Sequence, residues 1–95
     1  KCDYIFHAAG YAQPSKFIQD PISTIRLNAD ATKRLLDLAK KNKARFLFFS
    51  SAEVYGEIPK ELVPVPETYN GNCPTTSIRA VYGESKRMGE TICSI

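Results

Sequence analysis

The chain has 95 residues, of which 43% are hydrophobic and 24% charged, and its formal net charge is +3. This composition is typical of a globular protein and differs from that of disordered or fibrous chains. No apolar run approaches the roughly 20 residues of a membrane span, and no signal peptide is visible. We therefore expect a soluble, cytoplasmic protein without a membrane partner.

The basic and metal-ligating residues argue against two further functions. The only basic cluster lies where a helix should end, and cations there complement the helix dipole. The alternative is a patch for an anion or a partner protein. With a net charge this small we expect no binding to nucleic acid. A single histidine and an odd number of cysteines without C-x-x-C spacing make a metal site improbable, and fit a reducing compartment. The basic cluster is Lys40, Lys41, Lys43 and Arg45, and the cysteines are Cys2, Cys73 and Cys93.

The first half of the chain predicts a strand followed by a helix. Residues 3–9 form a continuously apolar run, which is typical of a strand buried on both faces in a parallel sheet. Residues 11–19 are polar and predict an irregular segment. Asp20 and Pro21 then form a helix-start signal, and the helix should end near Asn42. Its expected apolar face is Ile22, Ile25, Ala29, Thr32, Leu36 and Ala39, with Leu35 alongside.

The second half predicts another strand, a long loop and a second helix. Residues 44–51 are again continuously apolar and indicate a second strand buried on both faces. Four prolines make residues 57–78 an irregular loop, and loops of that length are usually functional. The last helix should run from about Arg79 into Ile92. Its expected apolar face is Val81, Ser85, Met88 and Ile92.

Strand, helix and strand in this order form a βαβ unit, so the fold class is α/β with a parallel sheet. Two buried strands need neighbouring strands and helices on both faces. The chain also begins just before a strand and stops inside a helix. We therefore interpret residues 1–95 as an internal part of a larger doubly wound domain.

Tyr82 and Lys86 are the most informative pair for chemistry. Residues four apart share a helix face, so the phenol and the ammonium can point into one site. A nearby cation favours the phenolate, which makes tyrosine a usable base near neutral pH. The spacing alone is weak support, because chance matches on exposed helix faces are common.

Four segments in order strengthen this interpretation: His7-Ala-Ala-Gly, Asn28-Ala-Asp-Ala-Thr, Phe48-Phe-Ser-Ser-Ala-Glu-Val-Tyr-Gly and Arg79-Ala-Val-Tyr-Gly-Glu-Ser-Lys-Arg. Together they resemble the extended short-chain dehydrogenase/reductase family, which contains NAD-dependent nucleotide-sugar epimerases, dehydratases and decarboxylases. The resemblance implies a Rossmann-type fold and NAD as cofactor. Residues 1–95 would be the central part of the NAD(P)-binding domain, without its N-terminal glycine-rich motif and the C-terminal substrate domain.

The resemblance also implies roles for single residues. Tyr82 would be the catalytic base for a sugar hydroxyl, and Lys86 would hold the nicotinamide ribose and tune Tyr82. Ser51 would hydrogen-bond the reacting oxygen, and Glu53 would be a second acid or base, although it could also be a surface carboxylate. The implied cofactor-binding residues are Ala8, Ala9, Gly10, Tyr11, Asn28, Ser50, Tyr82 and Lys86.

The reaction and the assembly remain open at this point. Ala52 stands where similar dTDP-glucose dehydratases carry an aspartic acid, and residues 67–71 and 79–87 look most like UDP-glucuronate decarboxylases. The resemblance therefore favours a decarboxylase over a dehydratase or a 4-epimerase, acting at C4 of a nucleotide sugar. A non-catalytic NAD(P)-binding relative and a small interaction domain are the alternatives. The family also implies a homodimer through the helices around residues 22–41 and 79–95. The 95-residue chain alone is expected to bind NAD poorly and to catalyse nothing.

Overall fold

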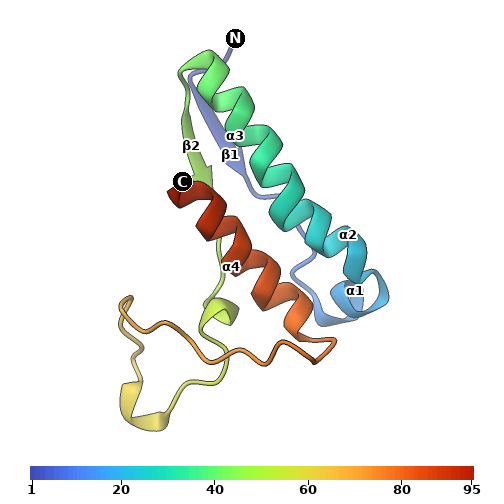
Figure 1. Ribbon diagram of the computed structural model, residues 1–95, viewed down its shortest axis with the longest axis vertical. Helices are drawn as coiled ribbons and strands as arrows, with labels where there is room; N and C mark the ends of the chain where they lie inside the picture. The colour runs from blue at the N-terminus through green and yellow to red at the C-terminus, as the bar shows by residue number, and fades with distance from the viewer.

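In the computed structural model, which describes residues 1–95, two parallel strands carry helices on one face (Figure 1). Strand β1 (Tyr4–His7) pairs with β2 (Arg45–Phe48), with Tyr4 opposite Arg45 and His7 opposite Phe48. The helices are α1 (Pro14–Gln19), α2 (Pro21–Ile25), α3 (Ala31–Asn42) and α4 (Ala80–Ser94). The α/β class and the parallel strand–helix–strand unit are confirmed. None of the helices has both the length and the apolar character needed to cross a membrane.

A single helical segment runs from Pro21 to Asn42 and connects the two strands. Asp20 caps its start, because its Oδ1 accepts from Ser23 N at 3.1 Å. Lys43 ends it in a left-handed conformation with φ of 53°, and its N–H returns to the carbonyls of Ala39 and Lys40. Between α2 and α3 the chain makes a π-helical turn, Arg26–Asp30, and such turns often occur at functional sites.

Within these 95 residues the two strands are covered on one face only, whereas the expectation of burial on both faces concerns the larger domain. Successive strand residues point to opposite faces, and all the helices lie on one of them (Figure 1). The other face leaves Phe6 65% and Leu47 48% exposed. Both strands are also shorter than the expected 3–9 and 44–51, because the chain leaves the ladder after His7 and Phe48.

The expected helix faces are partly wrong. Ile22 and Ile25 on the first helical segment and Met88 on α4 are exposed, whereas small and polar residues are buried. On α4, the burial of small residues depends on close packing at Gly89. A Cβ at this position would lie 2.4 Å from the Phe48 ring and 2.8 Å from Asn28 O, so only glycine allows α4 to pack this closely. The buried residues of α4 are Tyr82, Gly83, Ser85, Lys86 and Gly89.

The loop expected at 57–78 is mostly irregular, and it folds back on the segment after β2. Glu57 N donates to Asn72 O at 3.0 Å and Asn72 N donates to Tyr55 O at 2.9 Å. These bonds join the short 3₁₀ turn Ala52–Tyr55 to the returning loop, which lies beyond the lower end of the strands in Figure 1. The segment 11–19, expected to be irregular, contains α1 instead.

Candidate functional site

Two polar groups and a glycine meet beyond the carboxyl ends of the strands. Gly10 follows β1, Asn28 lies in the π-helical turn and Lys86 lies on α4. A Cβ placed on residue 10 would lie 3.0 Å from Asn28 Oδ1 and 3.9 Å from Lys86 Nζ. Ligands of open α/β sheets bind at this edge, so the arrangement marks a candidate binding site.

Tyr82 and Lys86 share the buried face of α4, as their spacing predicts. Lys86 Nζ donates to Phe49 O at 2.6 Å and lies 4.8 Å from the centre of the Phe48 ring and 5.9 Å from that of Tyr82. Burial lowers the pKa of Lys86. One of its three N–H groups is thus used by the strand end, which leaves two for a ligand.

The Tyr82 ring is held by packing while its hydroxyl stays available. Phe17 of α1 stacks on this ring with centroids 5.0 Å apart and planes 14° from parallel. The side-chain hydrogen bond found at Tyr82 is accepted by its backbone carbonyl, from Ser85 Oγ, and its hydroxyl has no partner in the chain. An aromatic clamp of this kind fixes where the phenolic oxygen lies without occupying it. Phe17 is a site residue that the sequence did not indicate, because α1 itself was not expected.

Ser51 and Glu53 lie at the end of β2, in the turn that leads to the loop. Ser51 Oγ accepts from Glu53 N at 3.2 Å, so its own proton is free for a substrate oxygen. Glu53 is exposed, and with Arg79 and Gly83 it lines a cleft of about 340 Å³. The strand end therefore brings a hydroxyl and a carboxylate to the α4 side of the sheet.

The other expected cofactor residues divide into two groups. Ala8 and Ala9 are exposed beside Gly10, and Tyr11 is half-buried. Ser50 donates its hydroxyl to Glu90 Oε1 at 2.6 Å, so its side chain is directed to α4. Among the expected cofactor-binding residues, Ala8, Ala9 and Gly10 are thus the ones that leave the backbone accessible.

Two further side chains were not indicated as functional by the sequence. Ser85 is buried and hydrogen-bonds Asn28 Nδ2 at 3.0 Å. Arg87 Nη1 donates at 2.7 Å to both Val54 O and Asn70 O, which ties the turn after β2 and the loop to α4. The sequence marks Ser85 and Arg87 only as the immediate neighbours of Lys86.

The residues at the strand ends fit a dinucleotide. Gly10 presents backbone without a side chain, so no Cβ stands between this backbone and the polar groups of Asn28 and Lys86. Asn28 Oδ1 is fully buried and has no hydrogen-bond partner in the chain, so it is an acceptor that the chain itself leaves unpaired. Lys86 supplies donors beside it. This set of one acceptor, one cation and a bare backbone suits the hydroxyl groups of a ribose.

Comparisons with known proteins agree with this geometry. The model of the NAD dependent epimerase/dehydratase family matches residues 1–95. UDP-glucuronic acid decarboxylase 1 of Xenopus tropicalis is 41% identical over 91 residues, which cover 96% of this chain and 21% of that protein. UDP-glucuronic acid decarboxylase 5 of Arabidopsis thaliana is 40% identical over 90 residues, covering 95% of this chain and 26% of that protein.

A solved structure, RMD from Pseudomonas aeruginosa complexed with NADPH, has a TM-score of 0.79 and 28% sequence identity. The match covers 96% of this chain and 29% of that chain. The neighbour is complexed with NADPH, which agrees with the NAD(P)-binding class expected from the four segments. The chain spans only about a fifth to a quarter of the curated relatives it matches. The chain belongs to the NAD dependent epimerase/dehydratase family.

Proposed function

We propose that this chain is the central part of the NAD-binding domain of a nucleotide-sugar-modifying enzyme, a UDP-glucuronate decarboxylase. The observation that carries the proposal is the meeting of Tyr82, Lys86 and Gly10 at the carboxyl ends of the strands, on a chain about 41% identical to such decarboxylases. The activity, the substrate and the cofactor site belong to the full-length protein.

Each polar side chain has a proposed task. Tyr82, as phenolate, removes the proton of the C4 hydroxyl of the sugar, and Lys86 stabilises that phenolate and binds a ribose hydroxyl. Ser51 donates its free proton to the same sugar oxygen, since its acceptor side is used by Glu53 N. Gly10, Asn28 and Lys86 would hold NAD, which would supply the acceptor for the hydride of C4. The packing of Phe17 on Tyr82 keeps the phenolic oxygen in place during the proton transfer.

The decarboxylation follows from the chemistry of the resulting ketone. A ketone at C4 is β to the carboxylate carbon, so the C5–carboxylate bond breaks and CO₂ leaves. The electron pair of that bond passes to the carbonyl and forms an enolate. Protonation of C5 then restores the ketone. Glu53 is the proposed acid or base for this proton, because it is the carboxylate in the turn that follows Ser51.

Replacing Tyr82 tests the proposal in the full-length protein. We expect Tyr82→Phe to lower kcat for UDP-glucuronate at least about 100-fold, because the general base is lost. NAD affinity should change less than about threefold, since the ring still stacks on Phe17. The measurement is CO₂ release and product analysis, with cofactor binding by calorimetry.

Tyr69→Phe is the matched control, because it removes a hydroxyl that only bonds the loop carbonyl of Glu57. It should leave kcat within about twofold. A wild-type protein that binds NAD but converts no nucleotide sugar would indicate the non-catalytic alternative. Conversion without CO₂ release would indicate an epimerase or a dehydratase.

We also propose a homodimer, formed by the outer faces of α2 and α4. A cavity of about 400 Å³ lies between these helices and the end of the loop, lined by Ile25, Ile78 and Met88 among others. Exposed apolar residues on this face support an interface, and a second copy presents the same complementary apolar surface.

A further inference from the structure

Ser85 lies at the centre of a buried chain of hydrogen bonds. Its hydroxyl donates to Tyr82 O at 3.0 Å and its oxygen accepts from Asn28 Nδ2, also at 3.0 Å. Ser85 is 5% exposed and Asn28 is fully buried. A polar pair this deep in a small protein is costly unless its bonds are made, so the arrangement is specific.

The direction of these bonds fixes the orientation of the Asn28 amide. A hydroxyl has one proton, and the Ser85 proton is used by Tyr82 O. The Ser85 oxygen can then only accept, so the NH₂ group of Asn28 must face it. The carbonyl oxygen, Oδ1, is consequently turned to the opposite side.

That opposite side is the strand-end site. Asn28 Oδ1 lies 3.0 Å and Lys86 Nζ 3.9 Å from the same point, the position of a Cβ on Gly10. A flipped amide would turn its NH₂ group toward the Lys86 ammonium. Two hydrogen-bond donors would then face each other without an acceptor between them. Both neighbours of the amide therefore favour one orientation.

The rest of Asn28 is held independently of this choice. Its backbone carbonyl accepts from Thr32 Oγ1 at 2.7 Å, and Gly89 of α4 packs against the same carbonyl. These contacts hold the backbone of Asn28, but they do not determine whether Oδ1 or Nδ2 faces the site. Ser85 is the side chain that decides between the two ends.

We propose that Ser85 is a positioning residue that holds the Asn28 amide with Oδ1 facing Gly10 and Lys86, where it accepts a hydrogen bond from a hydroxyl of the bound dinucleotide. The inference rests on the proposed function, because it places NAD at the strand ends. It assigns Ser85 a role in cofactor affinity, exerted through Asn28 and not by contact.

A double-mutant cycle on NAD binding tests this coupling in the full-length protein. We expect Ser85→Ala and Asn28→Ala each to raise the Kd of NAD about three- to tenfold. The Kd of the double variant should not exceed the larger of the two single-variant values, because both substitutions remove the same oriented acceptor. Ser85→Thr should bind NAD within about twofold of wild type, since it keeps the hydroxyl and Ser85 borders the 400 Å³ cavity, which has room for a methyl group.

Ser94→Ala is the matched control. It removes a hydroxyl that makes the same bond to the carbonyl three residues earlier, at 2.7 Å to Thr91 O, without a link to Asn28. Its Kd should be unchanged. Additive effects of Ser85→Ala and Asn28→Ala, a wild-type Kd for Ser85→Ala, or failed rescue by threonine would each overturn the proposal.

Thermal unfolding of every variant separates this effect from loss of the fold. If Ser85→Ala does not fold, Ser85→Cys takes its place in the cycle, because a thiol keeps the size but accepts hydrogen bonds weakly. Because the readout is NAD binding, the cycle is also informative for a protein that turns over no nucleotide sugar. Failure of the decarboxylase proposal and failure of the Ser85 proposal are therefore distinct results.

Discussion

Gly10 is the residue at which backbone, amide and ammonium come closest. An alanine here would place its Cβ 3.0 Å from Asn28 Oδ1, tighter than an ordinary carbon–oxygen contact. Asn28 cannot move away easily, because it is fully buried and bonded to Ser85. The glycine therefore keeps free the space beside both polar groups, where we propose that NAD binds.

We expect Gly10→Ala to weaken NAD binding about tenfold, because the new methyl group occupies the approach to Asn28 and Lys86. The melting temperature should fall by only a few degrees, since residue 10 is exposed and outside both strands. Isothermal titration gives the Kd. Ala12→Ser is the control, as it adds one heavy atom at an exposed position nearby, and equal NAD affinity in Gly10→Ala and wild type would contradict the steric argument.

At the scale of elements, Arg87 is the residue that fastens the loop to the rest of the fold. One nitrogen of its guanidinium binds carbonyls of both Val54 and Asn70, which belong to segments far apart in sequence. Gly71, with φ of 91°, lies against the same guanidinium, where a Cβ would be 2.5 Å from Nη1. The ion pair of Arg87 with Glu84 is longer, at 3.7 Å, and partly exposed, so it adds little.

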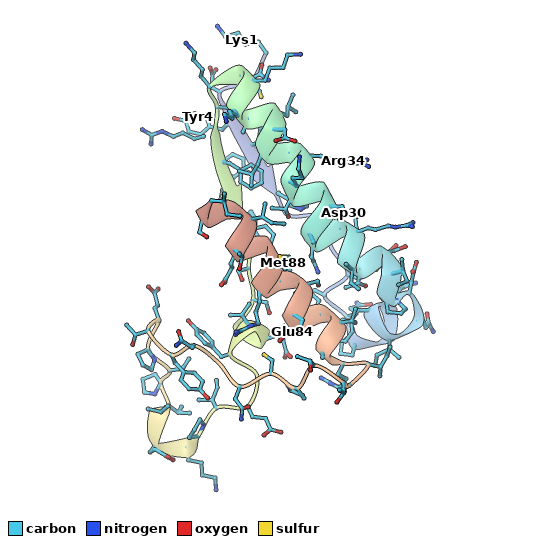
Figure 2. All side chains as sticks on the ribbon, in the orientation of Figure 1. Lys1, Tyr4, Asp30, Arg34, Glu84 and Met88 are labelled. Carbon is cyan, nitrogen blue, oxygen red and sulfur yellow. The ribbon has the colours of Figure 1, made fainter.

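Arg87→Met should loosen the loop and lower the free energy of unfolding by roughly 2 kcal/mol, because charge-assisted bonds to two carbonyls are lost. The measurements are urea unfolding and the rate of tryptic cleavage after Lys60, which lies in the loop. Cleavage should become several-fold faster. Arg34→Met, on the exposed side of α3 (Figure 2), is the control and should change neither quantity. An unchanged cleavage rate in Arg87→Met would show that the loop is held by other contacts.

The elements also show what the sequence can and cannot predict. The start at Asp20 and the end near Asn42 were predictable, because helix caps depend on a few neighbouring residues. The four-residue spacing likewise placed Tyr82 and Lys86 on one face. Helix α1 was missed because it has only six residues and is defined by Phe17 packing on Tyr82, a contact between distant segments. The π-helical turn and the amide of Asn28 depend in the same way on tertiary neighbours.

At the scale of the whole molecule, the chain is more open than a compact protein of its size. Its accessible surface is 6886 Å², against about 5,500 Å² expected from its mass. Its radius of gyration is 14.2 Å, against about 12.4 Å expected from its length. The excess includes two apolar surfaces, namely the bare face of the sheet and the outer face of α2 and α4, where Ile22 and Met88 are exposed.

The proposed dimer covers the second of these surfaces, and Met88 is the residue that tests it. Met88 is 52% exposed and lies one turn after Glu84 on α4 (Figure 2). We expect Met88→Lys to raise the dimer dissociation constant of the full-length protein at least about tenfold, because an ammonium would be buried against apolar side chains. The helix itself should not suffer, since Glu84 and a lysine four residues later form a favourable pair.

Sedimentation velocity over a range of concentrations measures the dissociation constant, and circular dichroism checks that α4 is intact. Val63→Lys provides a matched control, because Val63 is an apolar residue in the loop with 66% exposure and lies outside the α2–α4 face. It should leave the dissociation constant unchanged. If Met88→Lys dimerises as tightly as wild type, the subunits meet at a surface other than the α2–α4 face.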